Sequence, residues 1–180
     1  YLLQAFPESC CQSGHEYRAS RRLSDLRPGE VGAGAAREAL DLLGGNSPPT
    51  GALPGIFPPK VALDLLAPLV SSFSAEEMIK NRSRLAGRRG EKMFSDLLTL
   101  VDDGTVPWLT GSAPFDDERV PPVPRRLVDK GVLTSCFHSL RTSAIMSEEA
   151  TGNGFRPSMT AVPVPGPSNV FIQNGVQSPG

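Results

Sequence analysis

The segment RRLVDKGVLTSCF, residues 125–137, predicts a β-hairpin. Two short apolar runs, Arg126-Leu127-Val128 and Val132-Leu133-Thr134, flank Asp129-Lys130-Gly131, and residues of this last kind are typical of a tight turn. We therefore expect two antiparallel strands here, at the centre of a β-rich part of the chain.

The chain on both sides of this hairpin predicts further strands. Upstream, residues 98–101 have the extended pattern of a strand that ends at Asp102-Asp103-Gly104. Residues 104–124 carry too many prolines for a central strand and predict a long loop. Downstream, we expect a short helix over 138–146 and a last strand over 169–173.

Helices are expected in the first half, after an irregular segment over residues 1–28. One helix begins at Pro28 and stops at Gly44-Gly45. A second begins at Pro59, and a third follows Ser74, which with Glu77 reads as a capping box. The apolar positions expected to form the buried face of the second helix are Val61, Leu65, Leu66 and Leu69.

This order of elements predicts an α+β fold in which N-terminal helices precede an antiparallel β-rich part. The expected organisation is a helical segment over 1–45, a linker over 46–58 and an α+β portion over 59–180. The linker is assigned from its proline, glycine and serine content.

Composition excludes several classes of protein. The chain has 180 residues and a formal net charge of -1, which argues against a strongly basic nucleic-acid module. No stretch approaches the ~20 apolar residues that span a bilayer, so no membrane partner is expected. Three cysteines, an odd number, do not make a disulfide framework and favour a reducing, cytoplasmic location.

The histidines and cysteines offer few catalytic sites. His15-Glu16 matches the first two residues of a helical zinc-binding motif, but no second histidine follows at a position on the same helix face. Because zinc needs further ligands, we interpret His15 as an exposed loop residue. Cys136 and His138 alternate on an expected strand, so their side chains share one face. They are a candidate thiolate pair, against the alternative of a buried apolar cysteine. Cys10-Cys11 are a further candidate for metal binding or reaction.

Three polar segments are considered as possible binding sites and, alternatively, as solvated surface. Asp116, Asp117 and Glu118 form a carboxylate cluster that suits either a cation or a solvated loop. The basic run over 80–92 suits phosphates or a solvated helix face. The turn over 151–154 lacks the lysine of a phosphate loop. The residues by themselves therefore identify no catalytic group.

Several segments, taken in order, resemble the TldD/PmbA family. The resemblance is carried by the hairpin segment together with RSRLAGRRGEKMFS (82–95), LLTLVDDGT (97–105), FDDERVP (115–121), TGNGFRPSM (151–159) and PVPGPSNVFIQNG (163–175). Residues 16–44 are also similar to the helical region that precedes the linker in the family. It implies an incomplete TldD/PmbA-type domain, because whole members of the family are much longer. Arg119 stands where the family often has glycine, which leaves the local turn open.

The resemblance also implies a branch of this family. TldD-type subunits carry a HExxxH zinc motif just ahead of the segment equivalent to 82–95, whereas residues 62–81 contain no histidine. The chain is therefore similar to the PmbA (TldE) branch. That similarity implies a subunit that is not catalytic alone and binds no metal or cofactor itself. Its expected partners are a TldD-type zinc subunit and unfolded or extended peptides.

The expected substrate or interface residues lie in the two polar loops that carry the resemblance. They are Phe115, Asp116, Asp117, Glu118, Thr151, Gly152, Asn153 and Gly154. The alternative is a stand-alone adaptor, either a gyrase-modulator-type protein, after an older label of the family, or a nucleic-acid-associated protein. The near-neutral charge makes a nucleic-acid partner unexpected.

Overall fold

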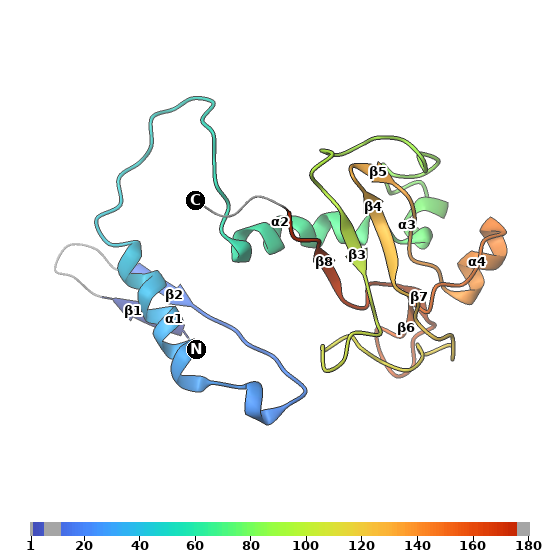
Figure 1. The fold of residues 1–180 in the computed structure, drawn as a ribbon, viewed down its shortest axis with the longest axis horizontal. Helices are drawn as coiled ribbons and strands as arrows, with labels where there is room; N and C mark the ends of the chain where they lie inside the picture. The colour runs from blue at the N-terminus through green and yellow to red at the C-terminus, as the bar shows by residue number, and fades with distance from the viewer. Residues whose placement is uncertain (1, 6–11, 176–180) are drawn as a thin grey trace. The chain divides into compact units, whose positions relative to one another are not determined.

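The computed structural model describes residues 2–5 and 12–175 and divides the chain into two compact units, 1–56 and 57–180 (Figure 1). Cys10 and Cys11 lie outside the described residues. The fold is α+β, as the sequence predicts.

The N-terminal unit is a two-stranded hairpin packed against one helix. Strands β1 (Leu2–Ala5) and β2 (Gln12–His15) pair antiparallel, and a single 3-10 turn, Leu23–Asp25, precedes α1 (Pro28–Asp41). A Cβ atom at Gly14 would lie 2.6 Å from the Ala39 nitrogen, so glycine lets the strand approach the helix closely. The prediction that residues 1–28 are irregular is therefore wrong. A four-residue strand carries too little apolar pattern to stand out from a loop.

The C-terminal unit is built on a four-stranded antiparallel sheet in the order β5-β4-β3-β8. Its strands are β3 (Leu100–Asp102), β4 (Arg125–Asp129), β5 (Val132–Leu133) and β8 (Val170–Ile172). The predicted hairpin is β4–β5, and Lys130 and Gly131 both have positive φ in its turn, at 46° and 82°. A second, two-stranded sheet pairs β6 (Gly154–Phe155) with β7 (Val164–Pro165).

Three helices complete this unit. They are α2 (Pro59–Ser71), α3 (Ala75–Ile79) and α4 (Leu140–Met146). Pro68 lies inside α2 without ending it. Helix α3 ends at Ile79, and Asn81, two residues later, takes a left-handed conformation with φ 56°.

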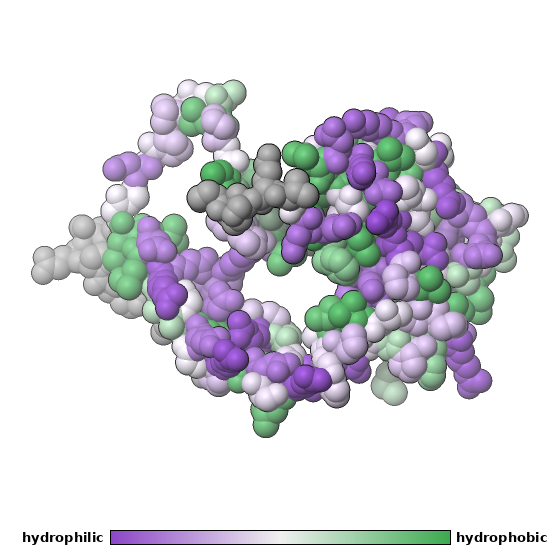
Figure 2. Space-filling view, viewed as in Figure 1, coloured by the Kyte–Doolittle hydropathy of each residue, from purple (hydrophilic) through white to green (hydrophobic). Residues whose placement is uncertain are grey.

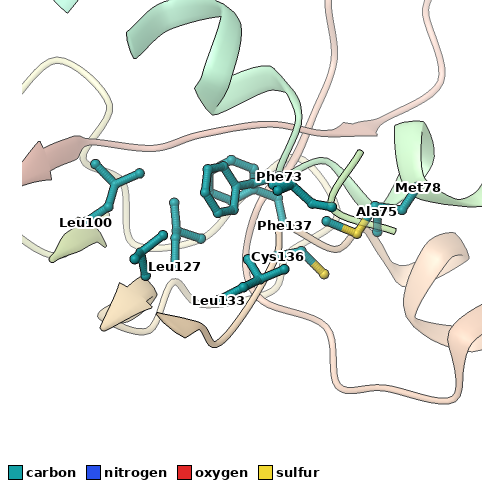
Figure 3. Packing of buried hydrophobic residues seen from close by; sticks show 10 residues of the cluster. Phe73, Ala75, Met78, Leu100, Leu127, Leu133, Cys136 and Phe137 are labelled. Atoms are coloured by element: carbon teal, nitrogen blue, oxygen red, sulfur yellow. The ribbon is translucent and has the colours of Figure 1, made fainter. Parts of the chain in front are cut away.

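The hydrophobic core lies between the sheet and the segments around α3 (Figure 3). The rings of Phe73 and Phe137 lie at its centre, with Leu100, Leu127 and Leu133 on the sheet side (Figure 3). Each of these side chains is at most 2% exposed. Because a well-packed core fixes the strands, it also fixes the loops that leave them.

The predicted buried face of α2 is not observed. No residue of α2 is fully buried: Val61 and Leu65 are exposed, while Leu66 and Leu69 are half-buried. A regular apolar pattern identifies the helix but does not say whether another element covers it.

The predicted capping box at Ser74 is also absent. The Ser74 hydroxyl donates to the Pro165 carbonyl at 3.2 Å and makes no cap bond. A capping box is found instead at the start of α4, between Ser139 and Thr142.

Candidate functional site

The two loops predicted as site residues lie side by side. The backbone N–H of Asp117 donates to the Gly154 carbonyl at 3.1 Å, and the Gly154 N–H donates to Asp116 Oδ2 at 2.8 Å. The Arg156 N–H adds a bond to Asp117 Oδ2 at 2.8 Å. Segments 115–118 and 151–154, separated in sequence by the whole hairpin, are thus joined by their backbones. We call these two segments the paired loops.

Asp116 holds the first of the paired loops in shape. Its side chain is buried, and Oδ1 accepts from the N–H groups of Glu118 and Val120, both at 2.9 Å. Both Asp116 oxygens are therefore directed at backbone donors of the protein rather than at solvent. Arg119 takes the left-handed conformation, φ 66°, which accounts for the turn at the position where the resemblance expects glycine.

Asn153 ties the second of the paired loops to the main sheet. Its Nδ2 donates to Asp102 Oδ2 at 2.8 Å, and Oδ1 of the same carboxylate accepts from the Ser168 N–H at 2.8 Å. Burial raises the pKa of Asp102, and these donors act in the opposite direction by stabilising the carboxylate. Sequence analysis missed Asp102, because Asp-Asp-Gly has the composition of a solvated turn.

Both glycines of the second loop are closely approached by neighbouring residues. Gly152 has φ +71°, and a Cβ atom there would lie 2.6 Å from the Pro121 carbonyl oxygen and the Pro122 Cα. A Cβ at Gly154 would meet the carboxylate of Glu118, which accepts from the Leu140 N–H at 2.7 Å. A side chain at Gly152 would therefore meet fixed backbone atoms, whereas one at Gly154 would displace the side chain of Glu118.

The predicted residues of the two loops differ in how far they are exposed. Thr151, Asn153 and Asp116 are 2%, 2% and 5% exposed, whereas Phe115 is 56% exposed. Most of the predicted site residues therefore form a buried network of hydrogen bonds that joins the two loops, which we call the polar lock. Phe115 and the solvent-facing Asp117 remain available for contact with another molecule.

Cys136 and His138 form a second, buried polar cluster. They flank Phe137, whose backbone bridges to Ser74, and Cys136 Sγ lies 3.1 Å from His138 Nε2. Burial raises the pKa of the thiol to about 11 and lowers that of the imidazole. The thiol is thus held neutral, which agrees with the reading as a buried cysteine and disfavours a nucleophile.

Two further residues of this cluster were not found from sequence. Glu148 Oε2 lies 3.5 Å from His138 Nε2, and Arg89 Nη1 approaches the same carboxylate oxygen at 2.6 Å. Arg89 Nε also donates to the Thr134 carbonyl at 2.7 Å. Their separation in sequence, 59 residues, left no local signal for the pairing.

The basic run is largely neutralised by neighbouring acids. Its ion pairs are Lys80 with Glu76, Arg82 with Glu77, Arg88 with Glu91, Arg89 with Glu148, and Lys92 with Asp96. This pattern favours a solvated face over a phosphate-binding one.

The C-terminal unit also has two surface hollows of similar volume. One, of about 300 Å³, is lined by Gly104, Thr105, Ser112, Ala113 and prolines 114, 121 and 122, next to the paired loops. The other is an apolar groove of about 320 Å³ between α2 and β8, lined by side chains that include Leu66, Val70 and Phe171. In Figure 2, green hydrophobic residues lie interspersed with purple hydrophilic ones on the face in view.

Two kinds of feature are absent from the part of the chain that the structure describes. Among residues 2–5 and 12–175, no three His, Cys, Asp or Glu side chains are grouped so that they could hold a metal ion. None of the helices in that part of the chain has the length and apolar character needed to cross a membrane.

Known proteins share this sequence and this fold. A TldD homologue of Haemophilus influenzae is 31% identical over 152 residues, which are 84% of this chain and 32% of the relative. The structure of a proposed modulator of DNA gyrase from Thermotoga maritima is 33% identical and superposes with a TM-score of 0.87, over 98% of this chain and 40% of that one. TldE from Thermococcus kodakarensis is 27% identical with a TM-score of 0.78, over 97% of this chain and 40% of that one.

The chain spans about a third of the length of the curated relatives it matches. Residues 50–180 match the family model described as the PmbA/TldA metallopeptidase C-terminal domain. The chain therefore belongs to the PmbA/TldD metallopeptidase family.

Proposed function

We propose that the chain is a non-catalytic, PmbA/TldE-type subunit of a metallopeptidase whose zinc is held by a TldD-type partner. The observation that carries the proposal is the composition of residues 62–81, just ahead of segment 82–95. They form most of α2 and all of α3, and they contain neither histidine nor cysteine.

The two glutamates of this region do not fit a zinc site. Glu76 pairs with Lys80 at 2.8 Å and also with Arg141, and Glu77 pairs with Arg82 at 2.6 Å. Zinc in proteins is held by imidazole, thiolate and carboxylate groups that are free to coordinate. Here both glutamates are engaged by cations, and Asp64 is the one other carboxylate of residues 62–81, so we derive no catalytic step through a metal in this chain.

The role left to this subunit is to support and enclose an extended peptide. Strand β8 is an edge of the main sheet, and an exposed edge can add a strand through backbone hydrogen bonds that do not depend on sequence. The paired loops are rigid because their polar groups are mutually satisfied, and they present Phe115 at the surface. We place the assembly in the reducing cytoplasm on the basis of the cysteine content.

The test combines the chain with a TldD-type zinc subunit, from which we expect co-purification and cleavage of an unfolded peptide. Phe115→Ala should weaken the complex by roughly tenfold or more if Phe115 is an interface anchor. Leu97→Ala is the matched control, because Leu97 is also exposed and apolar but lies outside the paired loops. A zinc subunit that is fully active alone and never associates with the chain contradicts the proposal.

The second candidate is a stand-alone adaptor of the gyrase-modulator type. It is favoured by the name of the Thermotoga maritima relative, whereas the ion-paired basic run argues against a nucleic-acid partner. Binding to DNA that falls steeply as salt rises would favour this candidate.

A further inference from the structure

His138 is a buried imidazole with an incomplete set of partners. The residue is 1% exposed, and Nε2 contacts Cys136 Sγ at 3.1 Å and Glu148 Oε2 at 3.5 Å. Nδ1 is also buried and has no hydrogen-bond partner among the described residues. A neutral ring tolerates this arrangement, because one nitrogen of neutral imidazole carries no proton.

A protonated ring does not fit the same surroundings. Both nitrogens of imidazolium are donors, so the Nδ1–H would be buried without an acceptor, which costs free energy. Among the charged groups that face the ring, Glu148 favours the proton, while Arg89 and Arg125 oppose it. Glu148 is already engaged by Arg89 at 2.6 Å, and the Cys136 thiol is neutral.

The backbone of His138 is bonded to the first residue of the second paired loop. The His138 N–H donates to Thr151 Oγ1 at 2.9 Å, and the same hydroxyl donates to the His138 carbonyl at 3.1 Å. Glu148, the contact of the ring, lies just before this loop in the chain. The segment 148–154 is therefore held by His138 in two ways, through the contact of its ring with Glu148 and through the hydrogen bonds of its backbone with Thr151.

We propose that His138 is an acid-sensitive latch: the segment 148–154 is closed over the neutral ring, and opening of this segment lets the ring take up one proton. The latch links the position of the paired loops to pH. It stands on contacts within this chain and is independent of the proposed subunit role.

The direction of the effect follows from proton linkage. The pKa of the closed ring is lowered, whereas an open, solvated ring has the ordinary value of about 6.5. Closure is therefore fully favoured above pH 6.5 and loses stability as pH falls below it. Uptake of one proton makes opening up to about tenfold easier per pH unit in this window.

Amide hydrogen exchange of the full chain between pH 7.5 and 5.5 tests the latch. Corrected for intrinsic rates, protection of the His138 and Gly154 amides should fall with acid by up to about tenfold per unit below pH 6.5. The core amide of Leu133, which donates to the Glu91 carbonyl at 3.0 Å, should not follow them.

The sequence offers a matched control, since it contains two histidines. His138→Gln should abolish the acid dependence of these amides, whereas His15→Gln should retain it. If His138→Gln fails to fold, titration of the wild-type ring decides, and it should titrate below the ring of an unfolded chain. Protection that does not change with pH, an equal loss at Leu133, or a ring that titrates at or above 6.5 overturns the latch.

Discussion

Gly152→Ala tests the close approach of the second paired loop to Pro121 and Pro122. Gly152 has φ +71°, and its missing Cβ would lie 2.6 Å from the Pro121 carbonyl oxygen and the Pro122 Cα. Alanine therefore meets two penalties, one from the backbone conformation and one from the neighbouring backbone atoms. Neither neighbour is a flexible side chain that could move away.

The chain provides a control that separates the two penalties. Gly87 has φ +72° and nothing within 4 Å of its Cβ position. The left-handed conformation costs an L-residue roughly 1–2 kcal/mol, and alanine recovers part of that by restricting the unfolded chain. We expect Gly87→Ala to cost about 1 kcal/mol, and Gly152→Ala to cost a further 1–3 kcal/mol for overpacking.

Urea unfolding followed by fluorescence measures this difference. Trp108 is the single tryptophan and lies in the C-terminal unit, so its signal reports on that unit. With a slope of roughly 2 kcal/mol per molar urea, Gly152→Ala should lower the midpoint by about 1–2 M and Gly87→Ala by about 0.5 M. Equal midpoints for the two variants would refute the reasoning.

Three further changes have expected outcomes. Ser139→Ala removes the cap bond to the Thr142 N–H and should cost about 1 kcal/mol in chemical unfolding. Asn153→Ala leaves a buried oxygen of Asp102 without its donor and should cost roughly 1–3 kcal/mol; because the pKa of Asp102 is already raised, the loss should shrink on acidification. Burial raises the pKa of the Cys136 thiol from 9.0 to about 11, so the thiol ionises more readily in the unfolded chain than in the folded one. The free energy of unfolding should therefore fall as pH rises from 9 to 11. Cys136→Ala should make this fall smaller.

Local chemistry explains what could be predicted from sequence. The β4–β5 hairpin was predicted because its turn residues and its apolar runs are adjacent in the chain. The start of α1 at Pro28 was predicted for the same reason. The cap at Ser74 was not, because a distant acceptor, the Pro165 carbonyl, takes its hydroxyl, and no local pattern reveals such a competitor.

The candidate site shows the same limit. The two loops singled out from sequence lie side by side in the structure, but most of their polar residues are buried rather than exposed. The partners that bury them, Asp102 for Asn153 and the Gly154 amide for Asp116, lie 51 and 38 residues away. These distant donors determine whether a carboxylate is free to bind another molecule or is used in hydrogen bonds within the protein. The role of such a carboxylate can therefore be assigned only from the folded structure.

This distinction changes what the family motifs mean in this chain. The segments FDDE and TGNG make the resemblance recognisable, and in the structure they serve mainly to lock two loops together. A lock of this kind is needed to hold the fold whether or not a metal lies nearby, so the motifs identify the family without identifying the catalytic branch. The branch is inferred instead from residues 62–81, which contain no histidine. Two glutamates of this segment, Glu76 and Glu77, form ion pairs with Lys80 and Arg82. Variants of the paired loops should therefore act first on stability, and those of exposed Phe115 on association.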